Sequence, residues 1–241
     1  MAFYATSSTT VTAPAIWWRS CRVWKNTVPN PSEPPSSELL SGPLEAVRPA
    51  IVDLKTIAKS NRPPAWQQQV ERIFFEASGR TFAPGSDRDW FRYRWLGRYL
   101  DAPGDPVLLA IVGETVAGYL VGCLQNPAEQ PRFSDLDYYL AHFATHCRRF
   151  PAHLHINLAP AYRSRGIGAA LIDAFAALAA SAGPTGVHVV TGKGMRNNRF
   201  YERCGFEPIG SAPWNGREVV LLGKSLGGAV ARHQPRKDAQ R

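Results

Sequence analysis

The sequence predicts an α/β domain in which a mixed, mostly antiparallel sheet is flanked by helices. Two apolar runs, "PVLLAIV" at 106–112 and "VAGYLVGCL" at 116–124, are separated by Gly113 and Glu114, a pair suited to a type II′ turn between antiparallel strands. From residue 153 onward, strand-like and helix-like segments alternate before a closing hairpin. This combination of hairpins and strand–helix–strand units indicates a mixed sheet covered by helices.

Two helices are expected before the first hairpin. Residues 44–52 supply a first strand, and Pro63 and Pro64 then precede a helical pattern that Gly79 ends. Its apolar residues share one face: Trp66, Val70, Phe74 and Ala77. Ser86 or Asp87 is expected to cap the second helix. The apolar stripe of that helix recurs every four residues: Phe91, Trp95 and Tyr99.

The segments after the hairpin begin with a polar and aromatic insertion at 125–150, expected to be helical around 136–147. Its aromatic residues either line a pocket or form the buried face of an amphipathic helix, and the second alternative is the more common one: Tyr138, Tyr139, Phe143 and His146. A strand, an alanine-rich helix to about residue 181, a strand, a short helix and a strand follow, and then a hairpin at Asn215 and Gly216.

The turn in "HLHINLAPAYRSRGIGAALI", at 153–172, joins a strand to a helix and is rich in glycine and arginine. Such a turn leaves main-chain N–H groups unpaired at the positive end of the helix dipole, where an anion binds. Gly166 and Gly168 let a phosphate approach the main chain, and Arg163 and Arg165 add charge-assisted hydrogen bonds. The turn therefore predicts a diphosphate site, against the alternative of an ordinary connection with solvated arginines.

Spacing excludes two common phosphate-binding motifs. The pattern G-x-x-x-x-G-K-[ST] of nucleotide hydrolases is absent. The dinucleotide fingerprint requires a small residue where this chain has Leu171, and it requires an acidic residue ending the next strand, where "VHVVT" has none.

The remaining pattern, R-x-x-G-x-G, is met by Arg163, Gly166 and Gly168. It resembles the coenzyme A pyrophosphate loop of the GCN5-related N-acetyltransferase superfamily, and its bacterial members in particular. Downstream, "MRNNRFYERCGFEPIG" resembles the superfamily's helix and strand around a tyrosine, with Tyr201 and Gly205 in the pattern F-Y-x-x-x-G-F. The resemblance spans residues 44 to 226. It implies the acyl-CoA N-acyltransferase fold, acetyl-CoA as acyl donor and an unidentified amine as acceptor.

The resemblance also implies which residues hold acetyl-CoA. The pantetheine arm would lie along the main chain of Ile156, Asn157 and Leu158. The pyrophosphate would be held by the turn itself: Arg163, Ser164, Arg165, Gly166, Ile167, Gly168 and Ala169. The family's cofactor-contacting asparagine is replaced by Gly194, so Asn197 is expected to supply that polar contact instead.

Acetyl transfer to an amine requires a neutral nucleophile and a proton for the departing thiolate. Tyr201 is the predicted proton donor, since a phenol with a pKa near 10 matches an alkyl thiol; the alternative is that its ring only packs beside the cofactor. His155, or else His153, is the predicted base. His153, His155 and Asn157 alternate on one face of their strand. The alternative is that these histidines only satisfy hydrogen bonds.

Composition limits the other functions. The four cysteines lack C-x-x-C spacing, so no metal site is expected, and a reducing, cytoplasmic setting is expected. No run approaches 18 apolar residues, so no membrane partner is expected. The formal charge of +9 forms no basic stripe, which ranks nucleic acid last among the partners. A non-catalytic acyl-CoA-binding module is the main alternative function.

The domain organisation follows from local composition. Residues 28–43, "VPNPSEPPSSELLSGP", are too rich in proline and serine for a helix or a central strand. Residues 1–43 are therefore expected to be a disordered or spurious extension, 44–226 an N-acetyltransferase domain, and 227–241 a basic C-terminal tail. A homodimer is left as an open alternative.

Overall fold

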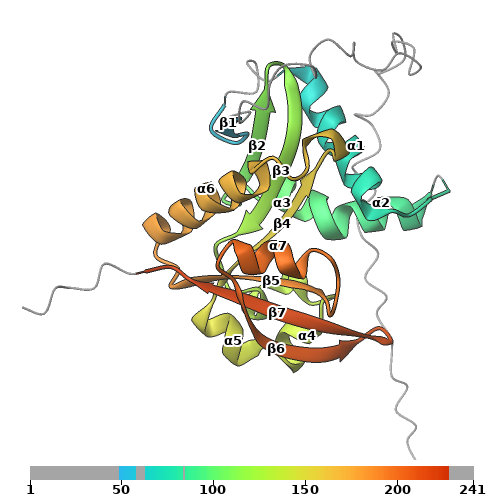
Figure 1. Cartoon of the computed structure of the whole chain (residues 1–241). Helices are drawn as coiled ribbons and strands as arrows, with labels where there is room; N and C mark the ends of the chain where they lie inside the picture. The colour runs from blue at the N-terminus through green and yellow to red at the C-terminus, as the bar shows by residue number, and fades with distance from the viewer. Residues whose placement is uncertain (1–48, 58–62, 84, 228–241) are drawn as a thin grey trace, which may run out of the picture. The chain divides into compact units, whose positions relative to one another are not determined.

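The computed structural model describes residues 49–57, 63–83 and 85–227 (Figure 1). The chain divides into two units, Met1–Glu45 and Ala46–Arg241, and every described residue belongs to the second. The predicted extension at 1–43 and the predicted tail, apart from Gly227, lie outside the described residues.

Within the described residues, seven strands form one sheet in the order β1-β2-β3-β4-β5-β7-β6. Only β4 and β5 pair in parallel, and every other neighbouring pair is antiparallel, which confirms the predicted mixed and mostly antiparallel sheet. The strands are β1 (Ala50–Asp53), β2 (Val107–Val112), β3 (Thr115–Cys123), β4 (Ala152–Leu158), β5 (Gly186–Gly192), β6 (Glu207–Trp214) and β7 (Arg217–Ser225).

Both predicted hairpins form. Gly113 has φ 59° in the turn between β2 and β3, as a type II′ turn requires at its first central position. Asn215 and Gly216 have φ 47° and 72° between β6 and β7, as a type I′ turn requires.

The main helices lie where the apolar patterns predict them. They are α1 (Pro64–Ser78), α2 (Ser86–Arg92), α3 (Arg98–Asp101), α4 (Tyr138–Ala141), α5 (Ala144–Arg149), α6 (Ile167–Ala182) and α7 (Asn198–Arg203). A π-helical turn, Tyr93–Gly97, joins α2 to α3, and 3-10 turns occur at Pro127–Glu129, Pro131–Phe133 and Pro160–Tyr162. Gly79 ends α1 in the left-handed conformation at φ 60°, as predicted.

The predicted cap of α2 is wrong. Neither Ser86 nor Asp87 caps the helix, because the cap position is Gly85 and no side chain there accepts a hydrogen bond. Gly85 has φ 142°, a backbone conformation that glycine permits, so Ser86 is already the first helical residue.

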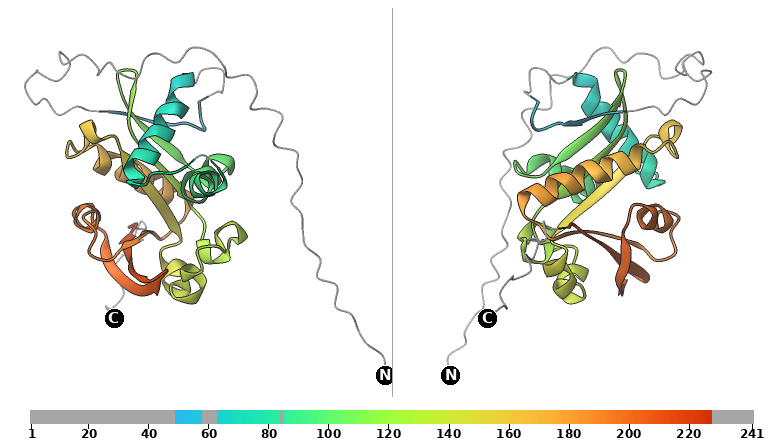
Figure 2. Two further views of the ribbon diagram at one scale, coloured as in Figure 1. Left: turned by 90° about the vertical axis from the view of Figure 1, so that its right-hand side faces the viewer. Right: turned by 60° about the vertical axis from the view of Figure 1, so that its left-hand side comes forward.

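Each face of the sheet carries its own apolar core. On one face α1, α3 and the insertion pack over β2 and β3, and on the other face α6 and α7 pack over the same sheet. Figures 1 and 2 show α1 and α6 on opposite sides of β2 to β4. Along β4, Leu154 and Ile156 belong to the α6 side, whereas His153 contacts Tyr99 on the α1 side, which confirms the predicted alternation.

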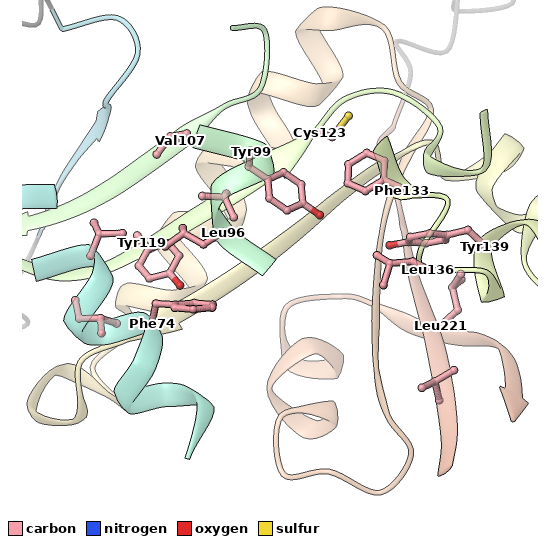
Figure 3. Close-up of a cluster of buried hydrophobic side chains, with 14 of the residues drawn as sticks. Phe74, Leu96, Tyr99, Val107, Tyr119, Cys123, Phe133, Leu136, Tyr139 and Leu221 are labelled. Carbon is pink, nitrogen blue, oxygen red and sulfur yellow. The ribbon is translucent and has the colours of Figure 1, made fainter. Parts of the chain in front are cut away.

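The insertion packs as core and does not form a pocket wall. Tyr138, Tyr139 and Phe143 are each at most 2% exposed and belong to the core on the α1 side, where Tyr139 lies near Phe133 and Leu136 (Figure 3). The expected single helix is broken into α4 and α5 between Ala141 and Ala144. Of the two alternatives for this segment, the amphipathic one is therefore confirmed.

Candidate active site

The parallel strands β4 and β5 separate soon after they meet. They pair only at Ala152 with Val187 and at His153 with His188. Beyond that point β4 remains paired with β3 as far as Leu158, and β5 remains paired with β7 as far as Gly192. A gap therefore opens in the middle of the sheet beside the C-terminal half of β4 (Figure 1).

The main chain of β4 offers hydrogen-bonding groups to this gap. The N–H of Ala159 donates to the carbonyl of Ala117 at 3.0 Å, which sets the alternation along the pair. The peptide groups of Asn157 therefore face β3, whereas those of Ile156 and Leu158 face the gap. The carbonyl of Leu158 accepts a hydrogen bond from Nε of Arg163 at 3.2 Å, as expected for a group that points away from β3.

Asn157 therefore differs from the other two predicted pantetheine residues. Its side chain faces the cavity described below, and its Nδ2 donates to Oη of Tyr119 at 2.8 Å. Any contact that Asn157 makes with a ligand in the gap must use this side chain, because its main chain is engaged with β3.

The glycine turn leaves a run of free amides. Within the described part of the chain, the six N–H groups of residues 164–169 donate no hydrogen bond; the first engaged amide is that of Ala170, which donates to the carbonyl of Gly166 at 3.1 Å. Ser164 and Gly166 both have left-handed backbones, with φ 59° and 78°, and α6 begins at Ile167. Unpaired amides at the start of a sixteen-residue helix make an anion site.

The two glycines of the turn have different surroundings. A Cβ at Gly166 would meet nothing within 4 Å, which leaves room for a ligand to approach the main chain. A Cβ at Gly168 would lie 2.9 Å from Cζ of Phe200 and 3.3 Å from Cδ1 of Leu158. The space beside Gly168 is thus occupied by Phe200 and Leu158, so close packing of α6 requires a glycine here, and the predicted contact of Gly168 with a phosphate stays a prediction.

A cavity of about 1000 Å³ reaches both faces of the separated strands. On the α6 and α7 side it contacts Ile156, Asn197 and Tyr201, and on the α1 side it contacts His155 and Trp95. The remaining lining residues come from α1 and the segment after it, α2, the π-helical turn, β4, β5 and the segment after it, and the β6–β7 hairpin: Phe74, Ala77, Ser78, Arg80, Phe82, Asp87, Trp90, Phe91, Arg94, Leu154, Asn157, Val190, Thr191, Gly192, Met195, Trp214, Asn215, Arg217 and Val219.

Tyr201 lies on α7 with only 7% of its surface exposed. Its ring lies between those of Phe200 and Phe206, with centroid distances of 5.3 and 5.7 Å. Burial raises the pKa of Tyr201 above its ordinary value, so the hydroxyl is protonated at neutral pH. Burial therefore makes the phenol of Tyr201 a weaker acid, and its pKa matches that of an alkyl thiol less closely than the sequence led us to expect.

His155 is the histidine of β4 that contacts the cavity. Its ring lies edge-on to Trp95 and Tyr99, with centroid distances of 5.3 and 5.4 Å. Burial, then the charge of Arg98 and then His188, lower its pKa to about 4, so its imidazole is neutral at physiological pH. Its Nε2 is buried and has no hydrogen-bond partner among the described residues.

His153, the alternative base, does not line this cavity. It is 1% exposed, its Nε2 lies 3.1 Å from Oη of Tyr99, and its ring stacks on His188 at 5.5 Å. Its position matches the structural interpretation of a buried histidine that satisfies a hydrogen bond.

Asn197 stands at the start of α7 and faces the cavity. Its Oδ1 accepts a hydrogen bond from Oγ1 of Thr191 at 3.1 Å, which fixes the side chain between β5 and α7. Gly194 has φ 74°, so the residue that replaces the family's asparagine adopts a conformation suited to glycine.

The sequence patterns did not assign the aromatic and charged side of the cavity. Phe91 and Trp95 were expected to form part of an apolar stripe, and only the hairpin at Asn215 and Gly216 was predicted beside Trp214. Distant parts of the sequence meet here: the ring centroids of Trp95 and Trp214 lie 6.5 Å apart. No local pattern in the sequence indicates this meeting.

In residues 49–57, 63–83 and 85–227, no group of three or more His, Cys, Asp or Glu side chains is placed to hold a metal ion. In the same ranges, no helix is both long enough and apolar enough to cross a membrane.

Comparison with known proteins gives consistent results. Residues 107–208, from β2 to the start of β6, match the family model of the acetyltransferase (GNAT) domain. The solved structure of SsHAT covers 74% of this chain and 98% of its own, at 20% identity and a TM-score of 0.55. A GNAT-family protein from Desulfovibrio desulfuricans covers 74% and 99%, at 20% identity and a TM-score of 0.52. A GCN5-related N-acetyltransferase from Kribbella flavida covers 74% and 98%, at 16% identity and a TM-score of 0.51. At such identities the similarity shows a common fold.

Proposed function

We propose that the chain, whose residues 107–208 match the acetyltransferase (GNAT) domain, is a member of the GCN5-related N-acetyltransferase superfamily and transfers the acetyl group of acetyl-CoA to an amine of a small molecule or a protein. The observation that carries the proposal is the cavity beside the separated strands β4 and β5, which reaches both faces of the sheet. Such a cavity lets a thioester carrier enter from one face and an amine from the other, so that the two reactants meet without a covalent enzyme intermediate.

The residues of the chain fit the carrier in three respects. The free amides of residues 164–169 suit a pyrophosphate, and the open space at Gly166 admits it to the main chain. The gap-facing N–H of Leu158 and both peptide groups of Ile156 suit the amides of a pantetheine arm, as in the addition of a strand to a sheet edge. Arg163 and Arg165 are exposed beside these amides and supply positive charge.

Acetyl-CoA supplies a thioester carbonyl that an amine can attack. We infer that Tyr201 donates its phenolic proton to sulfur as the C–S bond breaks, since this buried hydroxyl is protonated at neutral pH and faces the cavity. His155 accepts the proton that the amine loses as the C–N bond forms. Its low pKa means that it passes this proton on to solvent, which leaves the imidazole neutral for the next cycle.

The proposal extends to the boundaries and the setting of the enzyme. We assign the activity to residues 44–226 as one catalytic domain. We also propose a cytoplasmic location, because the described cysteines, Cys123, Cys147 and Cys204, are all free thiols, as expected in a reducing compartment.

The experiment that tests this function measures binding and turnover separately. Calorimetry should detect coenzyme A binding with a Kd between about 1 μM and 1 mM. Thiol release from acetyl-CoA should exceed background when a panel of amines is added. Binding without thiol release for any amine would identify a non-catalytic acyl-CoA-binding module, and absence of coenzyme A binding would contradict the whole proposal.

A further inference from the structure

One side of the cavity is lined by aromatic rings from two distant parts of the chain. We define the aromatic wall as Phe74, Phe82, Trp90, Phe91, Trp95 and Trp214. Phe91 bridges its neighbours, with centroid distances of 5.3 Å to Phe74 and 4.9 Å to Phe82. Trp90 is 51% exposed, so part of the wall presents aromatic surface to solvent where a ligand can cover it.

The aromatic wall lies on the acceptor side of the sheet. Phe74 and Trp95 pack with the α1-side core, which is the face that His155 contacts through Trp95. The free amides of residues 164–169 belong to the start of α6, on the opposite face. A carrier held by those amides therefore leaves the wall available to the second substrate.

Two arginines at the aromatic wall make no ion pair among the described residues. Arg80 lies over the rings of Phe82 and Phe91, at 5.3 and 5.2 Å, and makes no ion pair among the described residues. Arg217 lies opposite Trp214 in the register of the β6–β7 hairpin, so both side chains project from the same face. Arg217 too makes no ion pair in the described chain.

Other charged groups line the cavity or lie beside it. Arg94 shares Asp135 with Arg98: Oδ2 of Asp135 lies 2.8 Å from Nε of Arg94, and its Oδ1 lies 2.8 Å from Nη1 of Arg98. Asp87 is the one carboxylate among the residues that line the cavity, and it is exposed on the first turn of α2. Asp137 also lies at the wall, where its Oδ1 accepts a hydrogen bond from Nε1 of Trp214 at 2.8 Å. Arg80 and Arg217 remain without an ion-pair partner among the described residues, so each is free to bind an anion.

From these observations we propose that the acceptor is an amine with an aromatic body and an anionic group, such as an aromatic amino acid. Its ring stacks on the aromatic wall, its carboxylate is bound by Arg80 and Arg217, and its amine lies toward His155. This inference rests on the proposed function and adds a substrate class to it. Guanidinium groups pair with carboxylates through paired hydrogen bonds, so these two arginines select the anionic end.

The test compares acceptors that carry, lack or replace the anionic group. Phenylalanine and tryptophan, their carboxamides, in which the carboxylate is replaced by an uncharged amide, and the polyamine spermidine are each assayed for thiol release at saturating acetyl-CoA. We expect kcat/KM for each amino acid to exceed that for its amide by about tenfold or more, with spermidine the poorest acceptor, because one charge-assisted pair is lost in each amide.

Arginine variants then locate the source of the preference. Arg80→Gln and Arg217→Gln should each raise KM for the amino acids by about tenfold while leaving KM for the amides and for acetyl-CoA nearly unchanged. Arg72→Gln is the matched control, because Arg72 is exposed on α1 and does not line the cavity. This variant should behave as the parent does.

Three results would overturn the inference: equal or better turnover of the amides or of spermidine, a preference unaffected by both arginine variants, or no turnover of any of these acceptors by a protein that binds coenzyme A. If another amine is acetylated in their place, the acceptor class is wrong and the acetyltransferase function stands. Loss of coenzyme A binding itself would instead refute the proposed function.

Discussion

Replacing Gly168 by alanine places a methyl group where Phe200 already lies. The new Cβ would be 2.9 Å from Cζ and 3.1 Å from Cε2 of that ring, and 3.3 Å from Cδ1 of Leu158. Carbon atoms in favourable contact are about 3.5–4.0 Å apart, so the ring must move by several tenths of an ångström or more. Phe200 has little freedom to do so, because it lies on the short helix α7 and packs against the α6-side core.

The expected cost follows from this overlap. Overpacking of a filled site destabilises a protein by about 1–3 kcal/mol, and in a domain of this size each kcal/mol lowers Tm by about 2–4 °C. We therefore expect Gly168→Ala to lower Tm by about 2–12 °C. Because Tyr201 follows Phe200 in α7, we also expect kcat to fall.

The assay is a double-mutant cycle with Phe200→Leu, a change that removes the two ring atoms nearest the new methyl group. Urea unfolding of the parent, both single variants and the double variant gives the coupling free energy. We expect the double variant to be more stable than the sum of the two single effects by about 1–2 kcal/mol.

Additive effects in this cycle would refute the packing explanation of Gly168. So would a Gly168→Ala variant with parental stability and a raised Kd for coenzyme A, because that result would show that the glycine makes room for the ligand and not for Phe200.

Three further predictions address the cofactor turn, the proton donor and the buried histidines. Gly166→Ala should weaken coenzyme A binding by about tenfold in calorimetry. The new Cβ would project into the open space beside the free amides, and the φ of 78° disfavours alanine by about 1–2 kcal/mol. An unchanged Kd would contradict this prediction. Tyr201→Phe should lower kcat by about 10²–10⁴-fold with little change in the Kd of coenzyme A. Tyr93→Phe, a control at an exposed tyrosine, should change neither quantity. Parental turnover by Tyr201→Phe would exclude the acid role. Burial lowers the pKa of His188 from 6.5 to about 4, so the stability that depends on its neutral form is complete above pH 6.5 and is lost as the pH falls toward 4. Between pH 7.5 and 4.5, the free energy of unfolding of His188→Asn, measured in urea, should therefore fall by about 2–3 kcal/mol less than that of the parent. Equal falls in the two proteins would contradict this.

Local sequence patterns were sufficient to predict most elements of the fold. The turn residues Gly113 and Asn215 mark the two hairpins because few other residues adopt their backbone conformations. The spacing of Phe91, Trp95 and Tyr99 predicted a buried helical face, since side chains four residues apart share one side of a helix. These features depend on neighbours along the chain, which a single sequence contains.

The features that depend on tertiary structure were not predictable in the same way. The sequence does not specify where β4 leaves β5, because that point depends on how each strand pairs with its other neighbour. Trp95 and Trp214 meet only in the folded chain, so the aromatic wall has no contiguous signal. The packing contact of Gly168 was not predicted, because Phe200, its neighbour in the fold, lies 32 positions away in the sequence.

The most direct test of the account is the structure of the complex with coenzyme A. We predict that both phosphates of the pyrophosphate lie within hydrogen-bonding distance of main-chain N–H groups in residues 164–169, and that the pantetheine arm follows Ile156 and Leu158 through the gap toward Tyr201. Phosphates bound elsewhere, with these six amides still unpaired and the gap beside β4 vacant, would contradict it.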